Sequence, residues 1–121
     1  MSLSQYKTMF VCQDENGDTA LMLLCANHSE LVKYLINSPF CSPELLARRN
    51  KAGDTALMIA CRGPEGSDAV KCILGSQHYS PELLLQKNNN GDTVLLTACA
   101  YQPKDILEII IQACQSNEKS I

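Results

Sequence analysis

The sequence is poor in the residues that build aromatic pockets and membrane spans. It has no tryptophan, and phenylalanine and tyrosine together make up 5% of its 121 residues. No hydrophobic run approaches the roughly 18 residues that a membrane-spanning helix needs, and the N-terminal residues lack the apolar core of a signal peptide. With 45% hydrophobic residues, the composition favours one domain whose small and aliphatic side chains pack between helices, away from any membrane.

The usual signatures of a reactive or ligand-binding site are also missing. There is no Cys-x-x-Cys pair and no histidine-rich run, which zinc sites need, and no glycine-rich loop leads into Lys-Ser or Lys-Thr. His28 lies three residues after Cys25, but nothing in the sequence indicates an activated thiolate there. We therefore expect a protein that is not an enzyme and that holds no metal and no cofactor.

Charge and cysteine content indicate the kind of partner and the redox environment. Thirteen acidic and ten basic residues give a net charge of −3, so there is no electrostatic reason to expect a nucleic acid partner. The seven cysteines are odd in number and follow no secretion signal. We interpret them as reduced thiols, which predicts a cytoplasmic, reducing location.

What the sequence does contain is one phrase, repeated three times. Residues 14–25 read DENGDTALMLLC, residues 50–61 read NKAGDTALMIAC, and residues 88–99 read NNNGDTVLLTAC. The Gly-Asp-Thr core recurs after 36 and then 38 residues. Repetition at such a period is typical of a solenoid, in which each unit buries its apolar face only by stacking on its neighbours. The cysteine that ends each phrase, Cys25, Cys61 or Cys99, is expected to be a packing element.

Each phrase predicts a turn followed by a helix. Asn-Gly, at 16–17 and 90–91, is a turn signal because both residues tolerate positive φ, and the threonine two residues after each of the three glycines stands where a helix N-cap belongs. The preceding aspartate places negative charge beside the positive end of that helix. We expect first helices over 20–26, 56–62 and 94–101, and second helices over 30–36, 68–74 and 105–111. Ser29 and Ser67 suit the starts of the second helices in the first and second units, and Gly75 is placed to end the latter.

A further shared block lies between the units. Ser-Pro-Glu-Leu-Leu occurs at 42–46 and at 80–84, and serine followed by proline and glutamate is a compact helix start. We expect a one-turn helix at each place. Met9 and Phe10 stand at the positions of the paired leucines, which predicts a partial unit before the first complete one.

This order of turn, short helix, turn and amphipathic helix resembles the ankyrin repeat. The family places proline after the threonine and histidine two residues later; here those positions hold Ala20, Ala56 and Val94, and Met22, Met58 and Leu96. The positions that match the family pattern are Asp14, Gly17, Thr19 and Leu21, then Gly53, Thr55, Leu57 and Ala60, then Gly91, Thr93, Leu95 and Ala98.

The resemblance implies an all-α fold, an α-solenoid of ankyrin-like helix-turn-helix repeats joined by turn and hairpin loops. Residues 1–121 would form a single ankyrin-repeat domain. Its parts would be a partial N-terminal unit over 1–13 and three repeats over 14–49, 50–87 and 88–121.

The resemblance also implies a function, which is recognition of another protein without catalysis. Partners of ankyrin-like proteins usually bind a concave face, which the turn tips and the exposed side of each first helix form. Arg62 and Tyr101 are the best anchor candidates, because arginine and tyrosine dominate interface hot spots. The positions carried onto this face are Glu15, Asn16, Asp18, Ala26 and Asn27, then Lys51, Ala52, Asp54, Arg62 and Gly63, then Asn89, Asn90, Asp92, Ala100 and Tyr101.

Two matters stay open at this point. The alternative function is a targeting or substrate-recruitment domain of a larger enzyme or effector whose catalytic part lies outside this chain. The last predicted helix is apolar on two sides, over residues 106–114, and so expects cover on both. Three explanations compete: the chain is cut from a protein with further repeats or another domain, it associates with itself through an end, or its terminal segments fold back as caps.

Overall fold

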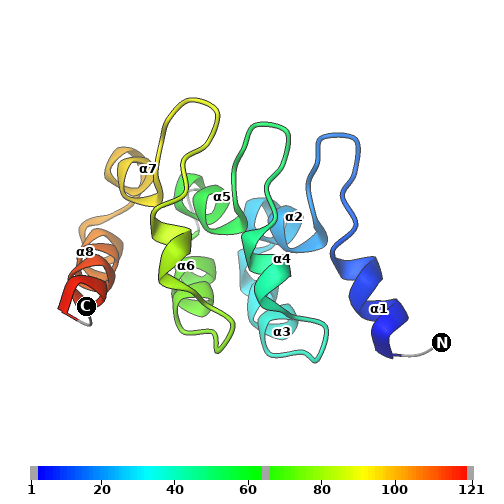
Figure 1. The fold of residues 1–121 in the computed structure, drawn as a ribbon. Coiled ribbons are helices and arrows are strands. Elements are labelled where there is room, and N and C mark those ends of the chain that lie inside the picture. Colours follow the sequence, from blue (N-terminus) through cyan, green and yellow to red (C-terminus); the bar gives the residue numbers. More distant parts are fainter. Residues whose placement is uncertain (1–2, 64–65, 120–121) are drawn as a thin grey trace.

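The computed structural model describes residues 3–63 and 66–119, and the side chains of residues 5–63 and 66–115. Its helices form two rows, and three long turns rise side by side along one edge (Figure 1). The inner row holds α2, α5 and α7, with α5 packed between the other two; in the outer row α3 packs on α6, and α8 packs on α7. The bounds are α2 (Ala20–Asn27), α5 (Ala56–Arg62) and α7 (Val94–Tyr101), then α3 (Val32–Ile36), α6 (Ser67–Leu74) and α8 (Lys104–Lys119).

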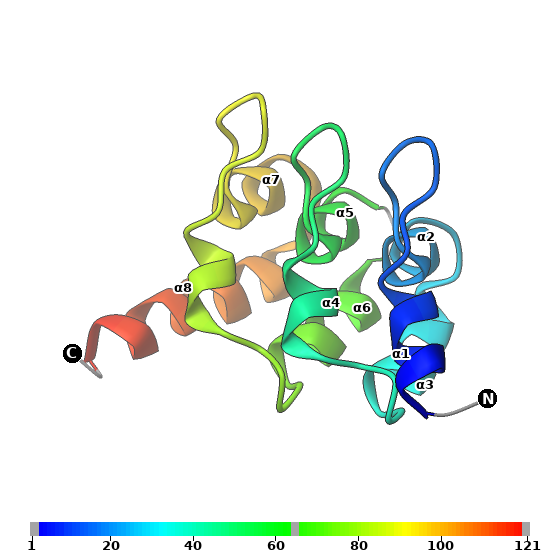
Figure 2. The ribbon, with the colours of Figure 1, turned by 45° about the vertical axis from the view of Figure 1, so that its right-hand side comes forward.

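This arrangement confirms the predicted all-α solenoid, and α1 and α8 lie at opposite ends of it (Figure 2). No strand occurs in the described part of the chain. Within that same part, no helix is both long and apolar enough to cross a membrane.

The first helix of each unit begins at the predicted threonine. The hydroxyl oxygens of Thr19, Thr55 and Thr93 accept hydrogen bonds of 3.3, 3.4 and 3.3 Å from the backbone N–H three residues later. Each threonine is therefore an N-cap, which satisfies one of the N–H groups that an α-helix leaves unpaired at its start.

The second helices depart from the prediction in two places. The first of them begins as a 3-10 turn, η1 (Ser29–Leu31), and α8 runs on to Lys119, well beyond the expected end at 111. Ser29 and Ser67 lie inside the first turns instead of capping them, and no side chain caps these helix starts. Gly75 ends α6 as predicted.

Short helices join the units where the Ser-Pro-Glu-Leu-Leu blocks predicted them. They are α4 (Pro43–Ala47) and η2 (Pro81–Leu84), and their N-cap serines, Ser42 and Ser80, accept backbone hydrogen bonds of 3.2 and 3.4 Å. At the other end, α1 (Leu3–Phe10) precedes the first turn. The ring of Phe10 stacks on that of Phe40 with 4.9 Å between their centroids.

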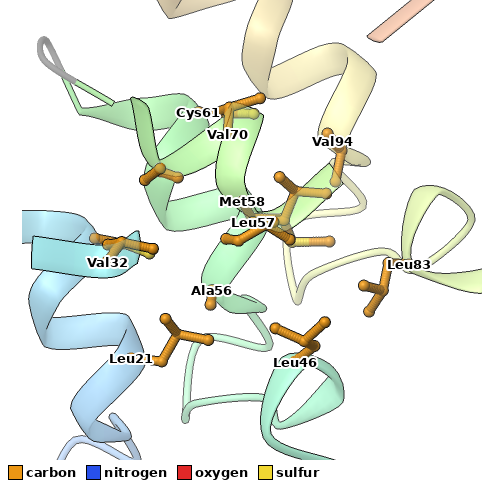
Figure 3. Packing of buried hydrophobic residues seen from close by; sticks show 14 of the residues in the cluster. Leu21, Val32, Leu46, Ala56, Leu57, Met58, Cys61, Val70, Leu83 and Val94 are labelled. Carbon is orange, nitrogen blue, oxygen red and sulfur yellow. The ribbon is translucent and has the colours of Figure 1, made fainter. Parts of the chain in front are cut away.

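The core lies between the rows and between the units. Figure 3 shows Leu21, Leu57 and Val94 of the three first helices gathered with Leu46 and Leu83 of the joining helices. All five are buried. Because each unit supplies only part of this cluster, removing one unit would expose its neighbours.

One recurring position breaks the pattern that the sequence predicts. We expected the cysteine that closes each phrase to be a packing element, and Cys25 and Cys61 are indeed buried. Cys99 is exposed. The third unit has no unit packed on its far side among the described residues, which leaves this thiol uncovered.

Candidate functional site

The three turns share one internal design. The side-chain oxygen of Asp14, Asn50 or Asn88 accepts hydrogen bonds of 2.9 to 3.0 Å from the backbone N–H groups two and four residues later. The turn glycines have φ of 81 to 83°, and no other described residue has positive φ. The asparagines before the glycines, Asn16 and Asn90, therefore do not adopt the positive φ that the Asn-Gly signal allowed.

Backbone hydrogen bonds join each turn to the next. The N–H of Lys51 donates to the carbonyl of Asn16 over 3.0 Å, and the N–H of Asn89 donates to the carbonyl of Ala52 over 2.9 Å. The guanidinium of Arg49 also donates a hydrogen bond of 3.0 Å to the carbonyl of Gly53 in its own turn, and another to the carbonyl of Lys87, which directly precedes the next turn. The tips therefore form a continuous, preorganised edge.

Hydrogen bonds between side chains also join neighbouring units, one layer below these backbone bonds. The amide of Asn50 donates to Oδ1 of Asp18 over 3.0 Å, and the amide of Asn88 donates to Oδ1 of Asp54 over 2.9 Å. The aspartates that the sequence placed beside the helix starts thus also hold the following unit in register.

Asp54 is the centre of the most connected group on this side of the molecule. Its carboxylate accepts two hydrogen bonds from Arg62, of 2.9 and 3.0 Å, in addition to the one from Asn88. Burial by itself raises the pKa of Asp54, but the hydrogen bonds from Arg62 and Asn88 and the charges of Arg62 and Arg49 outweigh it. The net pKa lies below its ordinary value, so Asp54 is ionised and fixes the direction of the Arg62 side chain.

A cleft of about 360 Å³ opens between the second and third units above this group. Tyr101 borders it with 58% of its surface exposed, and Leu96 with 55%. Half-buried Asp92 contributes a further carboxylate. The cleft therefore offers an aromatic ring, an aliphatic side chain, an oriented guanidinium and a carboxylate within one depression, which suits the side chains of a protein partner.

The structure brings together only part of the face that the sequence predicts. Asp54, Arg62, Asn90, Asp92 and Tyr101 line the cleft, with Ala52 and Ala100. Glu15, Asn16, Asn27, Lys51 and Asn89 are exposed elsewhere on the tips and helix ends, and Asp18 is half-buried.

The prediction placed Asp54 on the surface of this face, whereas the structure buries it. Both of its carboxylate oxygens are occupied by Arg62 and Asn88. Asp54 therefore acts by positioning Arg62.

Sequence reasoning also missed three residues of the cleft, Leu96, Thr97 and Asn88. Leu96 occupies the position at which Met22 and Met58 are buried, so the repeat pattern predicts a buried residue there. The sequence did offer one signal that Leu96 would be exposed: it belongs to the last of the three repeated phrases in this sequence. Asn88 could have been found from its recurrence three residues before the turn glycine.

The thiols give a first prediction. The pKa of Cys25 and the pKa of Cys61 are each raised to about 12, chiefly by burial; neighbouring thiols contribute to the rise at Cys25, and the charge of Arg62 opposes it at Cys61. Since the thiolate is the nucleophile, we expect iodoacetamide to modify Cys12 and Cys99 in the folded protein at pH 8 and to leave Cys25 and Cys61 intact. Peptide mass spectrometry over time measures this. Early labelling of Cys61 would contradict the packing described above.

A family model described as ankyrin repeats, in three copies, matches residues 3–82, which is more than half of the chain. No curated protein matches the sequence.

Proposed function

Since the chain belongs to the ankyrin-repeat family, whose repeats are general protein–protein interaction modules, we propose that it binds another protein through its concave face. This face comprises the turn tips and the exposed side of α2, α5 and α7. The observation that carries the proposal is the cleft beside Tyr101, where side chains of the second and third units border one depression.

The hydrogen-bonded edge supports this proposal energetically. Ordering flexible loops costs affinity, and a surface that is rigid before binding avoids that cost. The turns are held by their own side chains and by the ladder between units, so few backbone groups need to be fixed by a partner. Recruitment for a larger enzyme, the alternative drawn from the sequence, needs the same binding step.

The test uses one tyrosine in the cleft and one outside it. Tyr101→Ala removes the exposed ring from the cleft, whereas Tyr34→Ala removes a ring that is 66% exposed on the outer helix α3. Proteins captured from a cytosolic lysate are identified by mass spectrometry, and the affinity of the main one is measured with purified components. We expect Tyr101→Ala to weaken binding by roughly tenfold or more and Tyr34→Ala to leave it unchanged.

Equal loss in both variants, or none in either, would move the binding site away from this face. Arg62→Glu is unsuitable as a binding test, because it would place a second carboxylate against Asp54 and destabilise the fold itself.

A further inference from the structure

The far edge of the third unit lacks the cover that the same edge has in the first two. Met22 and Met58 are exposed by 1% and 0%, whereas Leu96 at the equivalent position is exposed by 55%. Cys99 differs from Cys25 and Cys61 in the same way. The edge of the third unit is therefore built from the residue types that the other units bury against a neighbour.

The turn glycines report the same difference. A Cβ on Gly17 would lie 2.8 Å from the backbone N of Lys51, and one on Gly53 would lie 2.7 Å from the side chain of Asn89. A Cβ on Gly91 would meet nothing within 4 Å. The third turn has the conformation of the others, but its outer side is open.

Two hydrogen-bond acceptors at this edge also lack the donors that the equivalent groups have in the first two units. In the first two units the aspartate accepts an amide from the next unit's asparagine, and a turn carbonyl accepts a backbone N–H from that unit. The equivalent groups are the carboxylate of Asp92 and the carbonyl of Asn90. No donor in the described part of the chain occupies either place.

We propose that the edge formed by Asn90, Asp92, Leu96 and Cys99 binds a further ankyrin-type unit that carries asparagine three residues before its turn glycine. That asparagine would donate its amide to Asp92, as Asn50 does to Asp18 and Asn88 to Asp54. The next N–H of its turn would donate to the carbonyl of Asn90. Asn90, Asp92 and Leu96 also line the cleft beside Tyr101, so this edge and the proposed partner site share residues.

A second copy of the same chain fits this edge less well. Its first unit has an aspartate, Asp14, at the position of Asn50 and Asn88. Stacking one copy on the next would bring the Asp14 carboxylate against that of Asp92, and two like charges at such a distance repel each other. The position three residues before the glycine therefore distinguishes a further unit with asparagine from the chain's own first unit.

The experiment supplies such a unit within one chain. Residues 1–111 are continued by residues 75–121, so that Gly75 ends the shortened α8 as it ends α6 and the added copy brings its own Asn88 opposite Asp92. Cys99 of the added copy is replaced by alanine. The readout is the rate at which iodoacetamide modifies the remaining Cys99, measured beside the 121-residue chain. We expect labelling to slow by at least about tenfold.

A matched variant carries Asn88→Asp in the added copy only. Aspartate serves the internal turn bonds as well, because Asp14 does so in the first unit, so the added unit keeps its own turn. In this variant, iodoacetamide is expected to modify the remaining Cys99 as fast as it does in the 121-residue chain. Equal protection by both added units, or protection by neither, would overturn the proposal. Slow labelling in the 121-residue chain together with a dimer in sedimentation velocity would also overturn it and assign the edge to a second copy.

Discussion

Replacing Gly53 by valine is expected to lower the free energy of unfolding by at least about 3 kcal/mol. Gly53 has φ of +82°, where a side chain costs roughly 1–2 kcal/mol and a β-branched one more. Its Cβ would also lie 2.7 and 2.9 Å from the side-chain oxygen and the backbone N of Asn89. Because that backbone N donates to Ala52, the collision strikes the ladder between the second and third turns. Urea unfolding followed by circular dichroism measures the loss.

Gly91→Val is the control for the backbone alone. Gly91 has nearly the same φ, +83°, but no atom lies within 4 Å of its Cβ. The two variants therefore share the conformational cost, and their difference reports the contact between units. If Gly91→Val were as destabilising as Gly53→Val, the contact between the turns would contribute nothing measurable.

Much of the fold could be predicted because the repeat states it three times. The threonine N-caps and the serine-capped joining helices follow from short-range chemistry, in which a side chain acts on the backbone within a few residues. Gly75 ends α6 as predicted, but with φ of −88° and not in the left-handed conformation. The start of the second helices was harder to predict. Ser29 and Ser67 have the right residue type for caps, but the chain enters each helix one residue earlier, at His28 and Gly66.

The site was predicted less well, because its geometry depends on contacts between units. Nothing within 50–61 shows that Asp54 is buried by an arginine eight residues later and an asparagine 34 residues later. Likewise, Leu96 shares a sequence position with buried Met22 and Met58, and only the neighbouring unit decides whether that position is covered. A repeat pattern therefore predicts which residues pack, but the place of each unit in the stack decides what they pack against.

Removal of the Asp54 carboxylate is the second large effect that we expect. Asp54→Ala leaves the guanidinium of Arg62 and the amide of Asn88 without their acceptor, and breaking a buried pair in this way costs about 3 kcal/mol or more. Because the Arg62 side chain is 38% exposed, water solvates part of it and keeps the loss near the lower bound. The matched control is Asp92→Ala, at the same position of the third unit but without an asparagine donor. Its unfolding free energy should stay within about 0.5 kcal/mol of the wild type.

The difference in unfolding free energy between wild type and Asp54→Ala should depend on pH, and the pKa of Asp54 fixes the sign of that dependence. Burial opposes ionisation of this carboxyl, but Arg62 and Asn88 more than compensate, so the folded-state pKa is lower than the unfolded value of about 3.9. The folded protein then binds this proton less readily than the unfolded chain does. The stability that Asp54 contributes is therefore complete above the unfolded pKa and is lost as the pH falls through the folded one.

We expect the difference in unfolding free energy between wild type and Asp54→Ala to be constant from pH 7 to about pH 5 and to shrink below pH 4. A difference that stayed constant down to pH 2 would mean that the interaction of Arg62 with Asp54 does not require the charge of the carboxylate.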